Sequence, residues 1–219
     1  MVVRADNVRR LSADGWRALV RHGVKRIVDL RFPEEMADDL GGALPVEVVH
    51  VSVLGDRRTA EWQAEQNVAM DAATDVTSYL VWSYGAFLEL YRDRFAVAVR
   101  AVADAPEGAV LLHCMGGKDR TGLLSALLLR VAGVPADAVA ADYALTEENL
   151  APSAAEWIAA AADEADRRRR ILLQPAPADA MRSVLDELDA RYGGVREYLR
   201  GAGVDDGALD RIRNRLVAA

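Results

Sequence analysis

The sequence predicts an α/β fold, with a small, mostly parallel central sheet surrounded by many helices. Short β-branched segments at 24–30 and 46–53 have the composition of strands. The uninterrupted apolar run 109–113 is typical of a central strand that is covered on both faces. From residue 136 onward, helical patterns separated by prolines and glycines fill the chain, so we expect a helical C-terminal part.

The remaining elements follow in order. Ser12 is a suitable N-cap for a helix that ends at Gly23, and loops are expected at 32–45 and 54–59. Weak periodicity over 61–82 predicts one or two helices, whereas the stronger pattern over 83–103 predicts one long helix. Helices are further expected at 121–132, 136–147, 152–170, 178–192 and 205–217.

Length, charge and composition limit the kinds of function. A chain of 219 residues suits a single domain, 1–219, and its net charge of -7 argues against nucleic acid as a partner. The N-terminus is too charged for a signal peptide and no apolar run is long enough to span a bilayer, so we expect no stable membrane insertion. The expected location is cytoplasmic, with export by another route and the oligomeric state left open.

The informative stretch is His-Cys-Met-Gly-Gly-Lys-Asp-Arg-Thr-Gly at 113–122. It joins a predicted buried strand to a predicted buried helix through a turn with two glycines. Such a turn can aim successive amides inward, and the helix start adds free N–H groups and a positive dipole end. The residues expected to bind phosphate are Met115, Gly116, Gly117, Lys118, Asp119, Arg120 and Thr121.

The side chains in this stretch suit nucleophilic phosphoryl transfer. Cys114 is the only cysteine, and a helix N-terminus with neighbouring cations favours its thiolate form. Arg120 offers a planar fork for two phosphate oxygens, and Thr121 can donate its hydroxyl to the sulfur. His113 is expected to support the backbone of the cysteine. We therefore predict a phosphocysteine intermediate that water hydrolyses, with no metal and no cofactor.

The motif Cys-x5-Arg-Thr resembles the signature of protein tyrosine phosphatases. Its Gly-Lys-Asp-Arg-Thr-Gly form is similar to the bacterial tyrosine/serine phosphatase family, which includes mycobacterial secreted enzymes with protein and phosphoinositide activity. Segments 27–31, 141–146 and 195–200 resemble further parts of that family. The resemblance implies a protein-tyrosine-phosphatase-like fold with a helical lid at about 150–175. Family members usually have residues ahead of Arg4, and whether an N-terminal edge strand is missing or replaced is left open.

The general acid that protonates the leaving oxygen has two candidates. Asp56 follows the second predicted strand, close to the position that the family resemblance implies, and Asp119 lies inside the motif itself. Arg31 and Asp142 are expected to support the motif from neighbouring segments.

Three functions stay open. The first is a phosphatase for phosphotyrosine in proteins, and for phosphoserine as well. The second is a phosphatase for phosphoinositides or for small sugar or nucleotide phosphates, and the third is an inactive phosphate-binding module. The run Arg167–Arg170 is interpreted as a solvated helix end rather than as a basic rim around the site.

Overall fold

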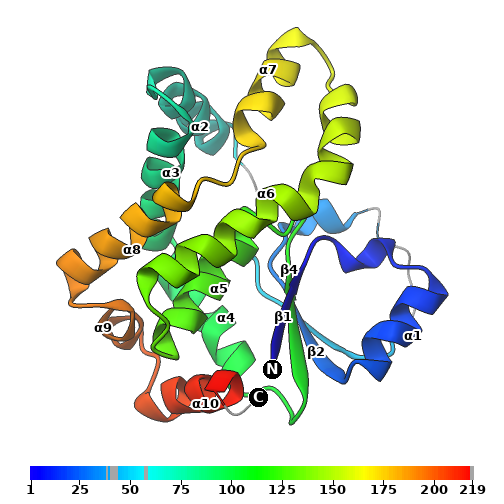
Figure 1. Ribbon diagram of the computed structural model, residues 1–219, viewed down its shortest axis with the longest axis vertical. Helices are drawn as coiled ribbons and strands as arrows, with labels where there is room; N and C mark the ends of the chain where they lie inside the picture. The colour runs from blue at the N-terminus through cyan, green and yellow to red at the C-terminus, as the bar shows by residue number, and fades with distance from the viewer. Residues whose placement is uncertain (38, 40–43, 57–58, 218–219) are drawn as a thin grey trace.

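The computed structural model describes residues 1–37, 39, 44–56 and 59–217. It confirms the α/β prediction: helices surround a four-stranded sheet whose paired strands all run parallel (Figure 1). The strand order is β1-β4-β2-β3, so the apolar strand β4 is central. The strands are β1 (Val2–Ala5), β2 (Val24–Asp29), β3 (Glu47–His50) and β4 (Ala109–His113).

Both faces of the sheet are covered, as the apolar pattern of β4 requires. On one face, α1 packs over a small cluster that includes Ile27 and Leu111. On the other face, α4 and α5 help to bury the larger core, which includes Val28 and Leu112. Figure 1 shows α1 on one side of the strands and α4 and α5 on the other.

The helices in chain order are η1 (Val8–Arg10), α1 (Ala13–Arg21), η2 (Pro33–Met36), α2 (Ala60–Ala72), α3 (Val76–Leu90), α4 (Arg92–Ala103), α5 (Asp119–Val131), α6 (Ala136–Ala159), α7 (Glu164–Leu173), α8 (Ala178–Tyr192), α9 (Val195–Gly201) and α10 (Asp206–Val217). Ser12 caps α1 as expected, because its side chain accepts from the Gly15 amide. None of the helices in the described ranges has both the length and the apolar character needed to cross a bilayer.

An N-terminal edge strand is present, because Val2–Ala5 pair with Val110–His113 along β4. One expectation about strands was wrong. The strand predicted over 46–53 is confined to Glu47–His50, since only these residues pair with β2. After His50 the chain turns inward, and Val51 and Val53 are buried in the core rather than in the sheet.

Two expectations about helices were also wrong, and one helix was not expected. The single helix over 83–103 is two helices, α3 and α4, which meet at Tyr91 with φ -118° and ψ 26°. Pro152 does not interrupt the chain's helical path, and α6 continues through it to Ala159. The carbonyl of Glu148, which Pro152 leaves without its helical donor, belongs to an exposed residue and can bond to water. The short helix α9 had no counterpart in the sequence pattern.

The second half of α6 and helix α7 form a helical hairpin, residues 152–173, that projects from the body of the molecule (Figure 1). The expectation that the arginine run ends a helix is only partly met, because Arg167 to Arg169 lie in the middle of α7 and Arg170 lies in its last turn. Arg170 pairs with Asp166 at 2.8 Å and lies over the Trp157 ring at 5.4 Å, so it ties α7 to α6.

Candidate active site

The loop from Cys114 to Arg120 joins the end of β4 to the first turn of α5. It is called the phosphate loop below, after the ligand that the sequence leads us to expect there. Gly117 has φ +68°, and a Cβ atom there would lie 2.5 Å from the Ala5 carbonyl oxygen. Glycine is therefore required for the loop to lie against the end of β1. The Asn7 amide also donates to the Met115 carbonyl at 3.2 Å. The edge strand that the sequence did not predict thus supports the phosphate loop.

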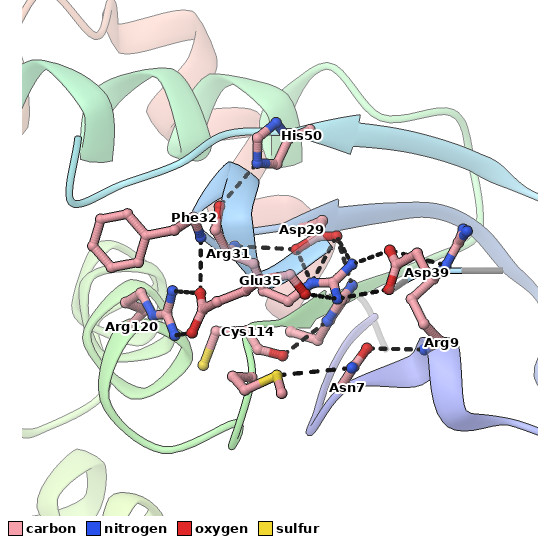
Figure 2. Close-up of polar contacts among 12 residues, drawn as sticks. Asn7, Arg9, Asp29, Arg31, Phe32, Glu35, Asp39, His50, Cys114 and Arg120 are labelled. Carbon is pink, nitrogen blue, oxygen red and sulfur yellow. Dashed lines mark hydrogen bonds and ion pairs between the residues drawn. The ribbon is translucent and has the colours of Figure 1, made fainter. Parts of the chain in front are cut away.

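Cys114 lies at the base of the loop and is 2% exposed. Figure 2 shows its sulfur beside the guanidinium of Arg120. Burial alone would lower the pKa of Arg120. The nearby cysteine and the Glu35 carboxylate raise it by more than burial lowers it, so the net shift of the pKa is upward. Arg120 thus supplies a permanent positive charge next to the sulfur.

Glu35, from the short helix η2, holds the Arg120 guanidinium. Its two oxygens accept from Nη1 at 2.5 Å and from Nη2 at 3.0 Å, as Figure 2 shows. Glu35 also accepts from the Phe32 amide at 2.8 Å, and the Phe32 ring lies 5.3 Å from the guanidinium carbon. This two-point contact fixes the plane of the guanidinium.

Beneath the loop lies a buried polar network that includes His113 and Arg31. His113 Nδ1 donates to the Cys114 carbonyl at 3.0 Å, and its Nε2 lies 3.5 Å from an Asp29 oxygen. Asp29 also accepts from Arg31, whose other contacts reach Asp39 (Figure 2). Burial lowers the pKa of His113. Burial would raise the pKa of Asp29, but its bonds from Arg31 and the nearby His113 lower it overall.

Asp119 begins α5 and is held by a tyrosine from α3. Its Oδ1 accepts from the Tyr84 hydroxyl at 2.5 Å, and the Tyr143 hydroxyl lies 2.7 Å from that of Tyr84. Lys118 Nζ lies 3.6 Å from the same oxygen. The side chain of Asp119 is 44% exposed and so remains accessible to solvent.

Two of the other predicted residues, Lys118 and Thr121, are buried. Lys118 Nζ donates to the carbonyl oxygens of Leu173 and Pro175, the latter at 3.2 Å, so it links the loop to the end of α7. Thr121 is fully buried, and in the described part of the chain its hydroxyl has no hydrogen-bond partner. In this structure the hydroxyl therefore makes no hydrogen bond to the Cys114 sulfur.

Asp56 and Asp142 make their contacts away from the phosphate loop. Asp56 has an 84% exposed side chain and pairs with Arg94 at 2.9 Å. Asp142 pairs with Arg4 at 2.7 Å and so joins α6 to β1. Within the ranges that the structure describes, no group of His, Cys, Asp and Glu side chains has the arrangement of a metal site.

Sequence reasoning missed Glu35 and Tyr84. Glu35 lies in an acidic segment that was predicted as a loop. Its place three residues after Phe32 has the spacing of a capping box, which could have indicated the start of the short helix η2. Tyr84 lies in α3, and nothing in its local pattern marks it.

The sequence model of the tyrosine phosphatase family matches residues 1–218. The chain belongs to the tyrosine phosphatase family. The chain is 30% identical over 226 residues to a tyrosine-protein phosphatase of Nostoc commune. This alignment covers 98% of the chain and 73% of the relative. The chain is also 27% identical over 220 residues to the triple specificity protein phosphatase PtpB of Mycobacterium tuberculosis. That alignment covers 92% of the chain and 79% of the relative.

Family membership makes this tyrosine-type phosphatase a hydrolase that acts on a phosphorylated substrate. This result agrees with the resemblance inferred from residues 113–122. The family model matches nearly the whole chain, and the fold is a parallel α/β fold as that resemblance implied.

Proposed function

We propose that this phosphatase hydrolyses phosphate monoesters through a phosphocysteine on Cys114, with phosphotyrosine in proteins as its main substrate. The thiolate attacks phosphorus, the S–P bond forms, and the bond from phosphorus to the ester oxygen breaks as that oxygen takes a proton from Asp119. Water then attacks phosphorus and gives its proton to the Asp119 carboxylate. The S–P bond breaks, inorganic phosphate leaves, and the thiolate is restored.

The observation that carries this proposal is the meeting of three features at one buried sulfur. The glycine-containing loop, the start of α5 and the guanidinium of Arg120 all lie at Cys114. Arg120 is oriented by Glu35 and suits the equatorial oxygens of the transferring phosphoryl group. The unpartnered hydroxyl of Thr121 suits stabilisation of the sulfur as a leaving group.

Asp119 is the better candidate for the general acid. It adjoins Arg120 in the chain and combines an anchored Oδ1 with an exposed side chain. Asp56 is held at the surface by Arg94. An acid must come within about 3.2 Å of the leaving oxygen, which favours a residue in the loop itself.

The hairpin 152–173 lies within the lid expected at about 150–175. We propose that it borders the active site and contributes to substrate selectivity. Lys118 links its end to the phosphate loop. Arg167 and Arg168 are exposed on α7 and suit a strongly anionic head group, so phosphoinositides are a second candidate substrate class. Small sugar and nucleotide phosphates are a third. A cytoplasmic location is proposed because a lone catalytic cysteine stays reduced there.

The test compares wild type with Cys114→Ser on a phosphotyrosine peptide, a soluble phosphoinositide and a sugar phosphate. We expect the highest kcat/KM on the peptide, and acid quenching should trap phosphate on the wild-type protein alone. Cys114→Ser should lose turnover while still binding the peptide. Turnover in the serine variant would overturn the mechanism, and a wild type that binds but never turns over would indicate a phosphate-binding module.

A further inference from the structure

We propose that Tyr84 is a positioning residue that holds Asp119 in the orientation for proton transfer, and that Tyr143 holds Tyr84 in turn. The inference rests on the proposed role of Asp119 as the general acid. It adds two residues outside the phosphate loop to the machinery of the reaction, one from α3 and one from α6.

The three side chains form one directed chain of hydrogen bonds. An ionised carboxylate only accepts, so the Tyr84 hydroxyl gives its single proton to Asp119 Oδ1 across 2.5 Å. The Tyr84 oxygen must then accept at its 2.7 Å contact with Tyr143, and Tyr143 donates. The order is therefore Tyr143 to Tyr84 to Asp119.

This chain assigns different roles to the two oxygens of Asp119. Oδ1 is occupied by Tyr84 and lies 3.6 Å from Lys118 Nζ. In the described part of the chain, Oδ2 has no hydrogen-bond partner, and the side chain is 44% exposed. Oδ2 is thus the oxygen that carries the proton to the leaving group. Without the Tyr84 hydroxyl, the carboxylate is free to rotate toward Lys118, which removes Oδ2 from that position.

The tyrosine pair is built rigidly. Tyr84 and Tyr143 are each 1% exposed, and their rings meet edge to face with centroids 6.2 Å apart. A Cβ atom at Gly122 would lie 2.9 Å from the Tyr143 ring, so the glycine that ends the signature lets this ring approach α5. Burial is the first cause that raises the pKa of both tyrosines, which keeps both hydroxyls protonated as donors.

The test uses the dependence of kcat/KM on the leaving group, because this ratio reports formation of the phosphocysteine. Phenyl phosphate needs protonation of its leaving oxygen, whereas 2,4-dinitrophenyl phosphate does not. We expect Tyr84→Phe to lower kcat/KM about 10-fold or more on phenyl phosphate and to leave dinitrophenyl phosphate nearly unchanged. Tyr143→Phe should show the same selectivity with a smaller loss.

Tyr79→Phe is the matched control, since Tyr79 lies on the same helix but donates to Gln66 at 3.0 Å. It should change neither rate. In the Asp119→Asn background, Tyr84→Phe should cause no further loss, because both changes remove the same proton transfer. Thermal unfolding confirms that each variant is folded, and Tyr143→Phe carries the same test if Tyr84→Phe does not fold.

Equal losses on both esters, or no loss on either, would overturn the positioning role. A leaving-group effect in Asp119→Asn without one in Tyr84→Phe would overturn this inference and leave the acid assignment intact. If Asp119→Asn itself affects both esters equally, the acid assignment fails as well. Loss of turnover in Cys114→Ser tests the nucleophile independently of both.

Discussion

At the scale of single residues, the phosphate loop depends on a glycine that has no substitute. We predict that Gly117→Ala destabilises the fold by about 2–3 kcal/mol, because φ +68° is strained for alanine and its Cβ would clash with the Ala5 carbonyl. The displaced loop should lower kcat/KM about 100-fold. Urea unfolding and steady-state kinetics measure the two effects.

Gly116→Ala is the matched control for that change. A Cβ atom at Gly116 has no heavy atom within 4 Å in the described part of the chain, and its φ is not positive. This variant should keep near wild-type stability. A Gly117→Ala protein as stable and active as Gly116→Ala would contradict the argument.

Glu35 is expected to affect the reaction through its neighbour Arg120. The Arg120 and Glu35 side chains are only 10% and 9% exposed, so their pairing is shielded from solvent. Glu35→Gln keeps the size but turns an amide toward the guanidinium. We predict about 10- to 100-fold lower kcat/KM, since Arg120 loses its fixed plane.

The pair of Arg26 and Glu47, joined at 2.8 Å with the Glu47 side chain 49% exposed, provides the comparison. Glu47→Gln should have little effect on kinetics or stability. A Glu35→Gln variant with wild-type kcat/KM would show that the phosphate loop alone orients Arg120.

At the scale of elements, the polar network between β2 and β4 makes stability depend on pH. The pKa of His113 lies below its ordinary value of 6.5, so the unfolded chain binds more protons below that pH. The free energy of unfolding should therefore fall as pH drops from about 6.5 toward the folded-state pKa. His113→Gln should flatten this part of the curve.

Asp29 produces a second fall at lower pH. Its folded-state pKa is below the ordinary 3.8, so its stabilisation is present above that pH and is lost as pH falls through the lower value. Urea unfolding at several pH values from 7 to 3 separates the two steps. The exposed His22 is the control, and a His22→Gln curve as flat as that of His113→Gln would contradict this assignment.

Which elements the sequence could predict depends on how local their causes are. The stretch 109–132 was predictable because its apolar strand, glycine turn and apolar helix are adjacent in the chain. The break at Tyr91 was not, since no glycine or proline marks it. Strand β1 was missed because its four residues acquire their role only through pairing with β4, more than 100 residues away.

The same distinction applies to the site. Cys114, Arg120 and Asp119 lie in one segment, whereas Glu35 and Tyr84 lie 85 and 35 residues from their partners. Such contacts arise from packing of η2 and α3 around the loop, and no local pattern encodes them.

At the scale of the whole molecule, a compact body carries a projecting hairpin at its active-site end (Figure 1). The body buries a continuous core, while most of residues 151–170 are exposed. Segments with few buried contacts open at low free energy. We therefore predict faster amide hydrogen exchange over 152–173 than over β4 and α5.

Lys118 links these two parts, because its ammonium donates to the carbonyl oxygens of Leu173 and Pro175. Lys118→Met keeps most of the side-chain volume and removes the donor, so exchange over α7 should rise about 5- to 10-fold, as the loss of about 1 kcal/mol or more of hydrogen bonding implies. Exchange in β4 and α5 should stay unchanged. Arg168→Met, which removes an exposed pair with Glu164, is the control within α7. If Lys118→Met and Arg168→Met alter exchange equally, the hairpin is attached to the body by packing and not by this lysine.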